Sequence, residues 1–165
     1  MNKARFNINR VLRRFARQER GAILAELAIV LPIMLLLFVG TAEFGLYFYN
    51  YSTLSKATRV GVRYISAKSY NDDNIAIAKN LVVCGVESAA IDACETGSEV
   101  ISGISGDNVE VSIVSGSSLL PTEVRVEIVN FNYQPIFDLG EFTGGDPWLD
   151  VPVAPSTTMR YTLTD

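Results

Sequence analysis

An apolar run from Ala22 to Ala42 constrains this chain more than any other feature. It holds 21 residues with a single charged side chain, Glu26. Roughly 20 predominantly apolar residues are enough for a helix to span the hydrocarbon core of a bilayer. The run therefore predicts a transmembrane helix over about residues 22–42. A carboxylate inside such a helix costs about 2.5–3.5 kcal/mol on insertion scales, and intramembrane carboxylates usually have a function.

The charges on the two sides of this run have opposite signs. Residues 1–20 carry seven Lys or Arg and one Glu, a net charge of +6, whereas residues 43–165 have a net charge of −9. Lys and Arg concentrate on the cytoplasmic side of membrane helices. We therefore expect a single pass, with the N-terminus in the cytoplasm and the C-terminal domain outside the inner membrane, a space that in a diderm bacterium is the periplasm. The acidic C-terminal part argues against nucleic-acid binding, which needs a basic surface.

The helical pattern continues beyond the apolar run. Apolar and aromatic residues recur at three- and four-residue steps from Phe44 to Ile65, which predicts one continuous helix over about residues 22–67. Residues 1–20 have no apolar face of this kind. We expect them to be disordered or weakly helical.

Two local features modify this helix. Pro32 lacks the N–H that would bond the Ala28 carbonyl, so a kink or local melting is expected there. The aromatic residues between Phe44 and Tyr51 suit a belt at the membrane interface. About half of these rings are expected to pack on the domain that follows.

The remaining residues, 68–165, predict a small domain that starts with a short helix. Asn and Asp residues open the segment 70–85, and its apolar spacing predicts an amphipathic helix that ends at Gly85. The segment after Gly85 has little pattern and is expected to be a loop.

The period then changes to two. Strict alternation in residues 108–114 and 122–131 predicts two paired strands, and residues 156–164 predict another. The fold class is therefore α+β: a long N-terminal membrane-spanning helix followed by a small antiparallel-sheet domain. The apolar face of the sheet needs a cover, and the helix over residues 44–66 offers one. One side of the last strand is expected to present Thr157, Met159, Tyr161 and Leu163.

Cysteine and histidine content narrows the chemistry. The chain has two cysteines, Cys84 and Cys94, and no histidine. Outside the cytoplasm such a pair is expected to form a disulfide rather than a metal or redox site. A Ser-His-Asp triad is excluded, and the glycines form no phosphate-binding pattern, so we expect no enzyme activity, metal or cofactor. Asp146 and Asp150 flank Trp148, where solvated carboxylates are commoner than a calcium or glycan site.

The N-terminal order of residues is similar to a known processing signal. A basic segment ends at Arg20-Gly21, and Glu26 is the fifth residue of the apolar run that follows. This order resembles the type IV prepilin signature, in which a membrane aspartyl peptidase cuts after the glycine. Glycine suits that position because it has no side chain to obstruct a protease.

Two stretches farther along the chain narrow the resemblance: Glu43-Phe44-Gly45 at the end of the apolar run, and Ala57 to Tyr64 on the helix beyond it. Over residues 18–66 the sequence resembles the TadE-like minor pilins, or pseudopilins, of the Tad (tight adherence) type IVb pilus system. It departs from the family pattern by Thr58, which is inserted before the first arginine of the second stretch, and by Val62, which replaces an alanine. The matching residues are Glu43, Phe44, Gly45, Arg59, Gly61 and Arg63.

The resemblance implies both a processing event and a role. Residues 1–21 would be a basic leader peptide, removed between Gly21 and Ala22. The mature protein would take part in Tad pilus assembly, initiation or tip formation and support adherence and biofilm formation. The implied partners are a prepilin peptidase, a small Flp-type major pilin, other minor pilins and the inner-membrane pilus assembly platform.

A physical role for Glu26 agrees with this resemblance. Cleavage would leave the Ala22 ammonium at the start of the helix, with Glu26 one turn along it. The helix dipole favours a carboxylate in the first turn by about 0.3–1 kcal/mol. The carboxylate can pair with its own ammonium or with that of a neighbouring subunit, and opposite charges attract far more strongly in a low-dielectric bundle than in water. Such pairing would favour assembly in register.

Other interpretations of these residues stay open. Glu26 can snorkel or stay protonated without a role, and the apolar run can be a secretory signal peptide cut after Ala42 or an uncleaved single-pass anchor. Arg59 and Arg63, at i and i+4, either contact acidic surfaces of neighbouring subunits or form a solvated face. The alternative function is a membrane-tethered periplasmic or surface adhesin, a binding module that forms no filament.

Overall fold

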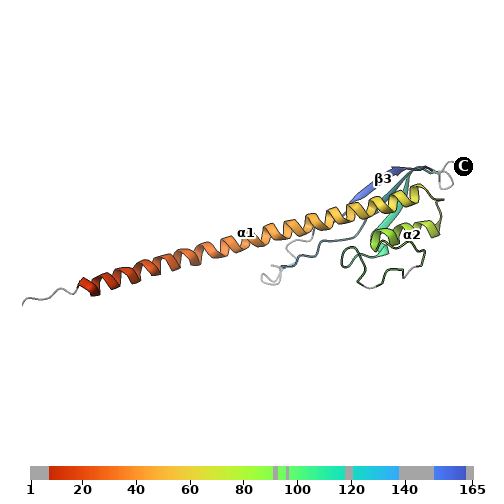
Figure 1. Ribbon diagram of the computed structural model, residues 1–165. Coiled ribbons are helices and arrows are strands. Elements are labelled where there is room, and N and C mark those ends of the chain that lie inside the picture. The colour runs from red at the N-terminus through yellow and green to blue at the C-terminus, as the bar shows by residue number, and fades with distance from the viewer. Residues whose placement is uncertain (1–7, 91–92, 96, 118–120, 138–150, 163–165) are drawn as a thin grey trace, which may run out of the picture. The chain divides into compact units, whose positions relative to one another are not determined.

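The computed structural model describes residues 8–90, 93–95, 97–117, 121–137 and 151–162, with side chains from Gly21 onward. Contacts within the chain divide it into two units, Met1–Ala42 and Glu43–Asp165. The described residues of the first unit form part of one helix, and the second unit contains the rest of that helix, a short helix and a sheet (Figure 1).

Helix α1 runs from Ile8 to Ser66 and is 59 residues long. It starts well before the expected residue 22, so the expectation of a disordered or weakly helical segment is corrected for residues 8–20. The residues there are mostly Arg, Leu, Ala, Gln and Glu, which have high helix propensity. Adding such residues to an existing helix avoids the cost of nucleation, so no apolar face is needed. Helical structure is also unbroken through Pro32, which contradicts local melting there. A bend at this proline stays a prediction.

Helix α2, from Asp72 to Val83, is the short helix that the sequence predicts. The Asn71 side chain caps its N-terminus by accepting a hydrogen bond from the Asn74 N–H at 2.8 Å. Asp72 and Asp73 lie in the first turn, where the helix dipole favours carboxylates. These two acids therefore have a structural explanation that requires no metal.

The strands form a three-stranded antiparallel sheet in the order β1-β2-β3. A 3₁₀ turn, η1 (Gly106–Asn108), leads into β1 (Val109–Gly116), and β2 (Pro121–Ile128) and β3 (Ser156–Arg160) follow. In this register Val126 lies between Val111 on one neighbour and Thr157 on the other. The strand order was beyond sequence reasoning. Strand β3 ends before Tyr161, and Leu163 lies outside the described residues.

The core of the second unit lies between the sheet, α2 and one side of α1 (Figure 1). The predicted cover of the sheet by the helix is confirmed: Thr58 of α1 and Thr157 of β3 share a hydrogen bond, with 3.0 Å between their Oγ1 atoms. The α+β class is confirmed as well. The buried side chains include Leu54, Val62 and Ile65 of α1, Ala78 and Val82 of α2, and Val109, Val124, Val126 and Ile128 of the sheet.

The loop after α2 is fixed to the helix at two points. A disulfide joins Cys84 and Cys94, whose Cα atoms are 5.7 Å apart. The buried Asn80 side chain donates hydrogen bonds to the carbonyls of Ser88 at 2.7 Å and Ala90 at 2.9 Å. Ser88, Ala90 and Cys94 of this loop are thus held against α2.

Candidate functional site

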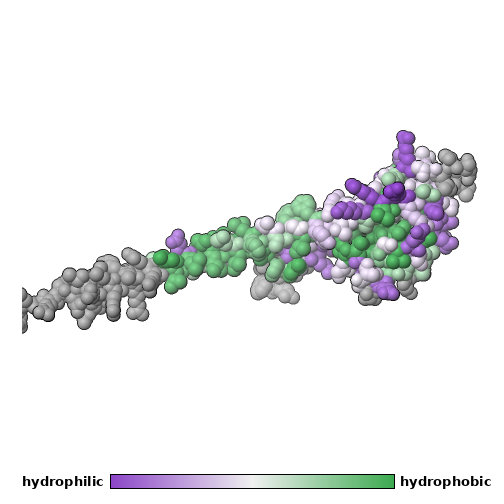
Figure 2. Space-filling view, in the orientation of Figure 1, coloured by the Kyte–Doolittle hydropathy of each residue, from purple (hydrophilic) through white to green (hydrophobic). Residues whose placement is uncertain are grey.

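The apolar segment of α1 is exposed on all sides. Every residue from Gly21 to Phe38 is exposed, and Phe38 itself retains 74% of its accessible surface. The described part of the chain contains one helix, Gly21–Ser66, that is long and apolar enough to cross a membrane, and its most apolar stretch has a mean hydropathy of 2.8 (Figure 2). A soluble monomer rarely exposes a continuous apolar surface of this size. No described residue covers this segment, and the helix supports membrane anchoring.

The residues of the predicted processing signal lie on this segment. Glu26 is exposed and forms no ion pair or hydrogen bond with any residue whose side chain is described. Gly21 and Ala22 are both helical, and open space surrounds the position where a Gly21 side chain would begin. Cleavage between them stays a prediction. A glycine there makes local unwinding easier, because it weakens a helix interior by about 1 kcal/mol relative to alanine.

Glu43, the first residue of the second unit, is buried, with 1% of its surface exposed. Its Oε2 accepts a hydrogen bond from the Tyr133 hydroxyl at 2.5 Å, and its Oε1 accepts one from the Phe137 N–H at 2.8 Å. The carboxylate therefore ties α1 to a segment 90 or more residues away in sequence. Sequence reasoning singled out Glu43 only through its family resemblance, and no local pattern indicates its partners.

The contact with Glu43 contributes to a raised pKa of the Tyr133 hydroxyl. Burial raises the pKa of its hydroxyl, and the hydrogen bond to Glu43 and the negative charge of that carboxylate raise the pKa further. The tyrosine hydroxyl therefore stays protonated at ordinary pH and remains a donor. A buried carboxylate without a cation nearby needs such donors.

Of the five aromatic residues from Phe44 to Tyr51, one packs on the domain, fewer than the expected half. Tyr47 is partly buried and meets the Tyr133 ring edge-on, with 5.8 Å between ring centroids. The other rings stay exposed and can serve as an interfacial belt. They are Phe44 (62% exposed), Phe48 (60%), Tyr49 (64%) and Tyr51 (42%).

Gly61 lies where α1 packs closely against α2. A Cβ atom at this position would be 2.5 Å from Cγ2 of Val82 and 3.1 Å from the backbone oxygen of Ala78. Both neighbours belong to α2, so the glycine permits the approach of the two helices. Gly45, in contrast, has open space around it. Of the two motif glycines, only Gly61 has a packing role within the described residues.

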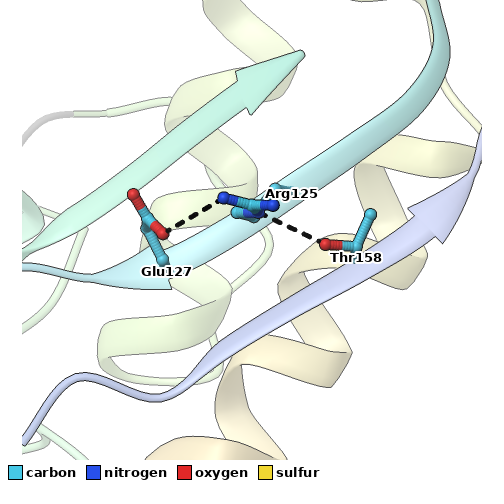
Figure 3. A network of polar contacts seen from close by, with 3 residues as sticks. All are labelled: Arg125, Glu127 and Thr158. Atoms are coloured by element: carbon cyan, nitrogen blue, oxygen red, sulfur yellow. Dashed lines mark hydrogen bonds and ion pairs between the residues drawn. The ribbon is translucent and has the colours of Figure 1, made fainter. Parts of the chain in front are cut away.

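Arg59 and Arg63 lie beside Gly61 in sequence but point away from the core. Both side chains are exposed, and neither forms an ion pair or hydrogen bond within the described parts of the chain. The outer face of the sheet differs, because Arg125 contacts Glu127 at 3.9 Å and the Thr158 hydroxyl at 3.3 Å (Figure 3). An exposed ion pair of this kind contributes little stability.

A cavity of about 340 Å³ lies between α1 and the segments 100–102 and 131–136. Leu46, Ile101, Phe131 and Ile136 make much of its lining apolar, and the lining contains no carboxylate, amine or thiol. No group of three potential metal ligands occurs within the described residues. Asp146, Trp148 and Asp150 lie outside these residues. Within the described residues, the lining of this cavity thus offers an apolar surface for contact and no carboxylate that could act as an acid or base.

Comparison with known proteins finds a family match for one segment of the chain. A family model described as TadE-like protein matches residues 21–63. This match covers the exposed apolar segment and the packed part of α1 as far as Arg63. No match was found among curated proteins, and none among solved structures.

Proposed function

Through residues 21–63 the chain belongs to the TadE-like family of Tad pilus systems, and from this premise we propose that it is a minor pilin, or pseudopilin. It is processed by a prepilin peptidase after Gly21 and takes part in pilus assembly, initiation or tip formation. The observation that carries this proposal is the exposed apolar helix with Glu26 near its start. Its apolar segment lies inside the family match and is exposed from Gly21 to Phe38.

The apolar segment has two successive environments in this proposal. Before assembly it is held in the inner membrane, with the N-terminus on the cytoplasmic side and the sheet-bearing unit in the periplasm. During assembly the helix leaves lipid for a bundle of neighbouring helices. Both environments cover apolar side chains, so the transfer changes little hydrophobic free energy.

Glu26 provides the specificity that apolar contact lacks. Its carboxylate pairs with the Ala22 ammonium created by cleavage, on the same subunit or on a neighbour. In a bundle of low dielectric constant this attraction is much stronger than in water, and an unpaired charge is unfavourable. A helix in the wrong register leaves both charges unpaired, so the pair selects one register.

The second unit is the part that an assembled helix displays. Glu43, Gly61 and the Thr58–Thr157 hydrogen bond fix the second half of α1 to its own domain. The partners that we propose are a prepilin peptidase, a Flp-type major pilin, other minor pilins and the inner-membrane assembly platform. The role requires no catalysis. Adherence and biofilm formation would follow from the pilus as a whole.

The test is the intact mass and N-terminal sequence of the protein purified from membranes of its own host. We expect a chain that starts at Ala22. A chain that starts at Glu43 would indicate plain secretion. A chain that retains Met1 in cells with an active prepilin peptidase would contradict the proposed processing and favour a membrane-tethered binding module.

A matched pair of variants tests the role of Glu26. Glu26→Ala should lower the amount of protein in sheared pilus fractions at least tenfold and leave the domain folded. Glu95→Ala removes an exposed acid from a loop of the second unit and should leave that amount unchanged. Equal recovery of both variants would rule out Glu26 as an assembly residue.

A further inference from the structure

One side of α1 in the second unit is uncovered and carries only positive charge. Lys56, Arg59 and Arg63 follow one another at three- and four-residue steps, so they lie on one face of the helix. All three are exposed, as is Val60 between them, at 50%. We call Lys56, Arg59 and Arg63 the cationic face. The opposite side of α1, with Leu54 and Ile65, is buried against the domain.

The cationic face differs from other cations of the same unit. Lys68 lies over the Tyr64 ring, Lys79 donates a hydrogen bond to the Gly106 carbonyl at 3.4 Å, and Arg125 pairs with Glu127. The three residues of the cationic face form no ion pair, hydrogen bond or ring contact within the described residues. Three neighbouring charges without an internal partner indicate a surface available for an external one.

The rest of the unit is acidic, in keeping with its net charge of −9. Two exposed acids, Asp72 and Asp73, are neighbours in the first turn of α2, and neither forms an ion pair within the described segments. Because α2 packs on the buried side of α1 at Gly61, these acids and the cationic face lie on different sides of α1. We call Asp72 and Asp73 the acidic surface.

We propose that the cationic face of one copy binds the acidic surface of a second copy of this chain. The inference rests on the proposed function, because it describes how neighbouring subunits would contact each other outside the membrane. The contact joins two different surfaces, so each copy keeps one surface free for the next copy. A head-to-tail contact of this type extends into a row rather than closing as a symmetric dimer.

A membrane surface is the less suitable partner for the cationic face. Arg59 and Arg63 lie eight and twelve residues after Tyr51, the last ring of the interfacial belt. At 1.5 Å per residue this is about 12 and 18 Å of helix. The polar layer of a bilayer is thinner, because headgroups add only about 5–8 Å on each side of the hydrocarbon core. Anionic lipid would therefore be out of reach of these two arginines.

Zero-length crosslinking tests the contact directly. The full chain in neutral detergent micelles, as an equal mixture of ¹⁵N-labelled and unlabelled copies, is treated with a carbodiimide and digested. We expect an isopeptide bond between the Lys56 amine and a carboxylate of the acidic surface, with the two peptides from differently labelled copies. An Arg59→Lys, Arg63→Lys variant keeps the charge and adds two amines, so it should give further mixed-label links. The absence of mixed-label links from this face in both proteins overturns the proposal.

Two triple variants separate the effect of the cationic face from the effect of net charge. K56Q/R59Q/R63Q and K68Q/R125Q/R160Q change the net charge equally, but only the first alters the cationic face. In sedimentation experiments on the full chain at low salt, the first should lower the self-association constant at least tenfold and the second less than twofold. High salt should lower the self-association constant of the wild type toward that of the first variant. Equal effects of the two variants overturn the proposal.

Reconstituted vesicles test whether anionic lipid, rather than a second copy, binds the cationic face. The full chain is placed in phosphatidylcholine vesicles with and without phosphatidylglycerol, and the acylation rate of Lys56 is measured. Equal rates support the protein contact, and protection by phosphatidylglycerol overturns it. These variants leave Gly21 and Glu26 intact. A chain that starts at Ala22 but whose two triple variants associate equally would refute only this inference, whereas a chain that retains Met1 would refute the proposed processing.

Discussion

The two halves of α1 differ in how composition relates to burial. From Gly21 to Ala42 the helix is almost entirely apolar and exposed, whereas from Glu43 to Ser66 it is more polar and has one buried side. Leu35 in the first half is 55% exposed, and Leu54 in the second half is fully buried. The same residue type in the same helix thus has opposite surroundings.

This contrast separates two ways of covering apolar surface. The second half is covered by the chain itself, through α2 and the sheet. The first half has no such partner among the described residues, and in the proposed function it depends on lipid or on neighbouring helices. Substitutions in the second half should therefore change the stability of the domain, and substitutions in the first half should change only membrane insertion or assembly. The four predictions that follow test this division.

The largest expected effect comes from truncating a leucine in each half. Leu54→Ala should lower the free energy of unfolding of the second unit by about 3 kcal/mol, because it removes a fully buried side chain from the core. Leu35→Ala should leave that free energy unchanged. Amide hydrogen exchange of β2 in the full chain in micelles measures both. Comparable losses in the two variants would contradict the division between the two halves of α1.

Replacing Glu43 should have the next largest effect. Glu43→Leu removes the acceptor of the Tyr133 hydroxyl and of the Phe137 N–H, which should cost about 2 kcal/mol. Glu43→Gln keeps one acceptor oxygen and should cost less. Chemical denaturation of the full chain gives both values. If Glu43→Leu is as stable as wild type, the buried carboxylate does not hold α1 to the 131–137 segment.

The two motif glycines should respond with opposite signs. Gly61→Ala should destabilise the domain by about 1–2 kcal/mol, because the new Cβ meets Val82 and the Ala78 backbone, and the gain in helix propensity offsets only part of this. Gly45→Ala has open space and should stabilise the helix by about 0.5–1 kcal/mol. Thermal unfolding of the two variants side by side is the measurement. A neutral Gly61→Ala would show that α1 and α2 can separate without cost.

The smallest expected effect is a loss of stability at alkaline pH. The pKa of Tyr133 is raised in the folded chain, so an unfolded chain loses this proton first, near the ordinary value of 10. The stability that Tyr133 contributes is complete below about pH 10 and decreases as pH rises toward the folded pKa. Urea midpoints between pH 8 and 11 should fall less steeply for Tyr133→Phe than for wild type. Parallel slopes would contradict the role of this hydroxyl.

Much of the fold could be predicted from the sequence because the relevant signals are local. A run of apolar residues, a three- and four-residue period and a period of two each depend only on neighbours in the chain. These signals predicted the apolar helix, its continuation, α2 and all three strands. The helical state of residues 8–20 was missed because it depends on propagation from the helix that follows.

The candidate site was predicted unevenly for the same reason. Gly21, Ala22 and Glu26 form a contiguous signal, and the family match includes them. Glu43 and Gly61 entered only as matching motif residues, and their contacts depend on partners distant in sequence: Tyr133 and Phe137 for one, Ala78 and Val82 for the other. No spacing within the helix indicates such partners.

The sequence by itself therefore determined which segments are helix or strand and that one apolar segment needs an external cover. Only the tertiary structure decided the strand order, which side of α1 is buried, and which charges are left without an internal partner. Local patterns fix backbone conformation because they depend on near neighbours. The pairing of buried and charged groups depends on which distant segments meet, and that is settled only when α1 packs on the sheet.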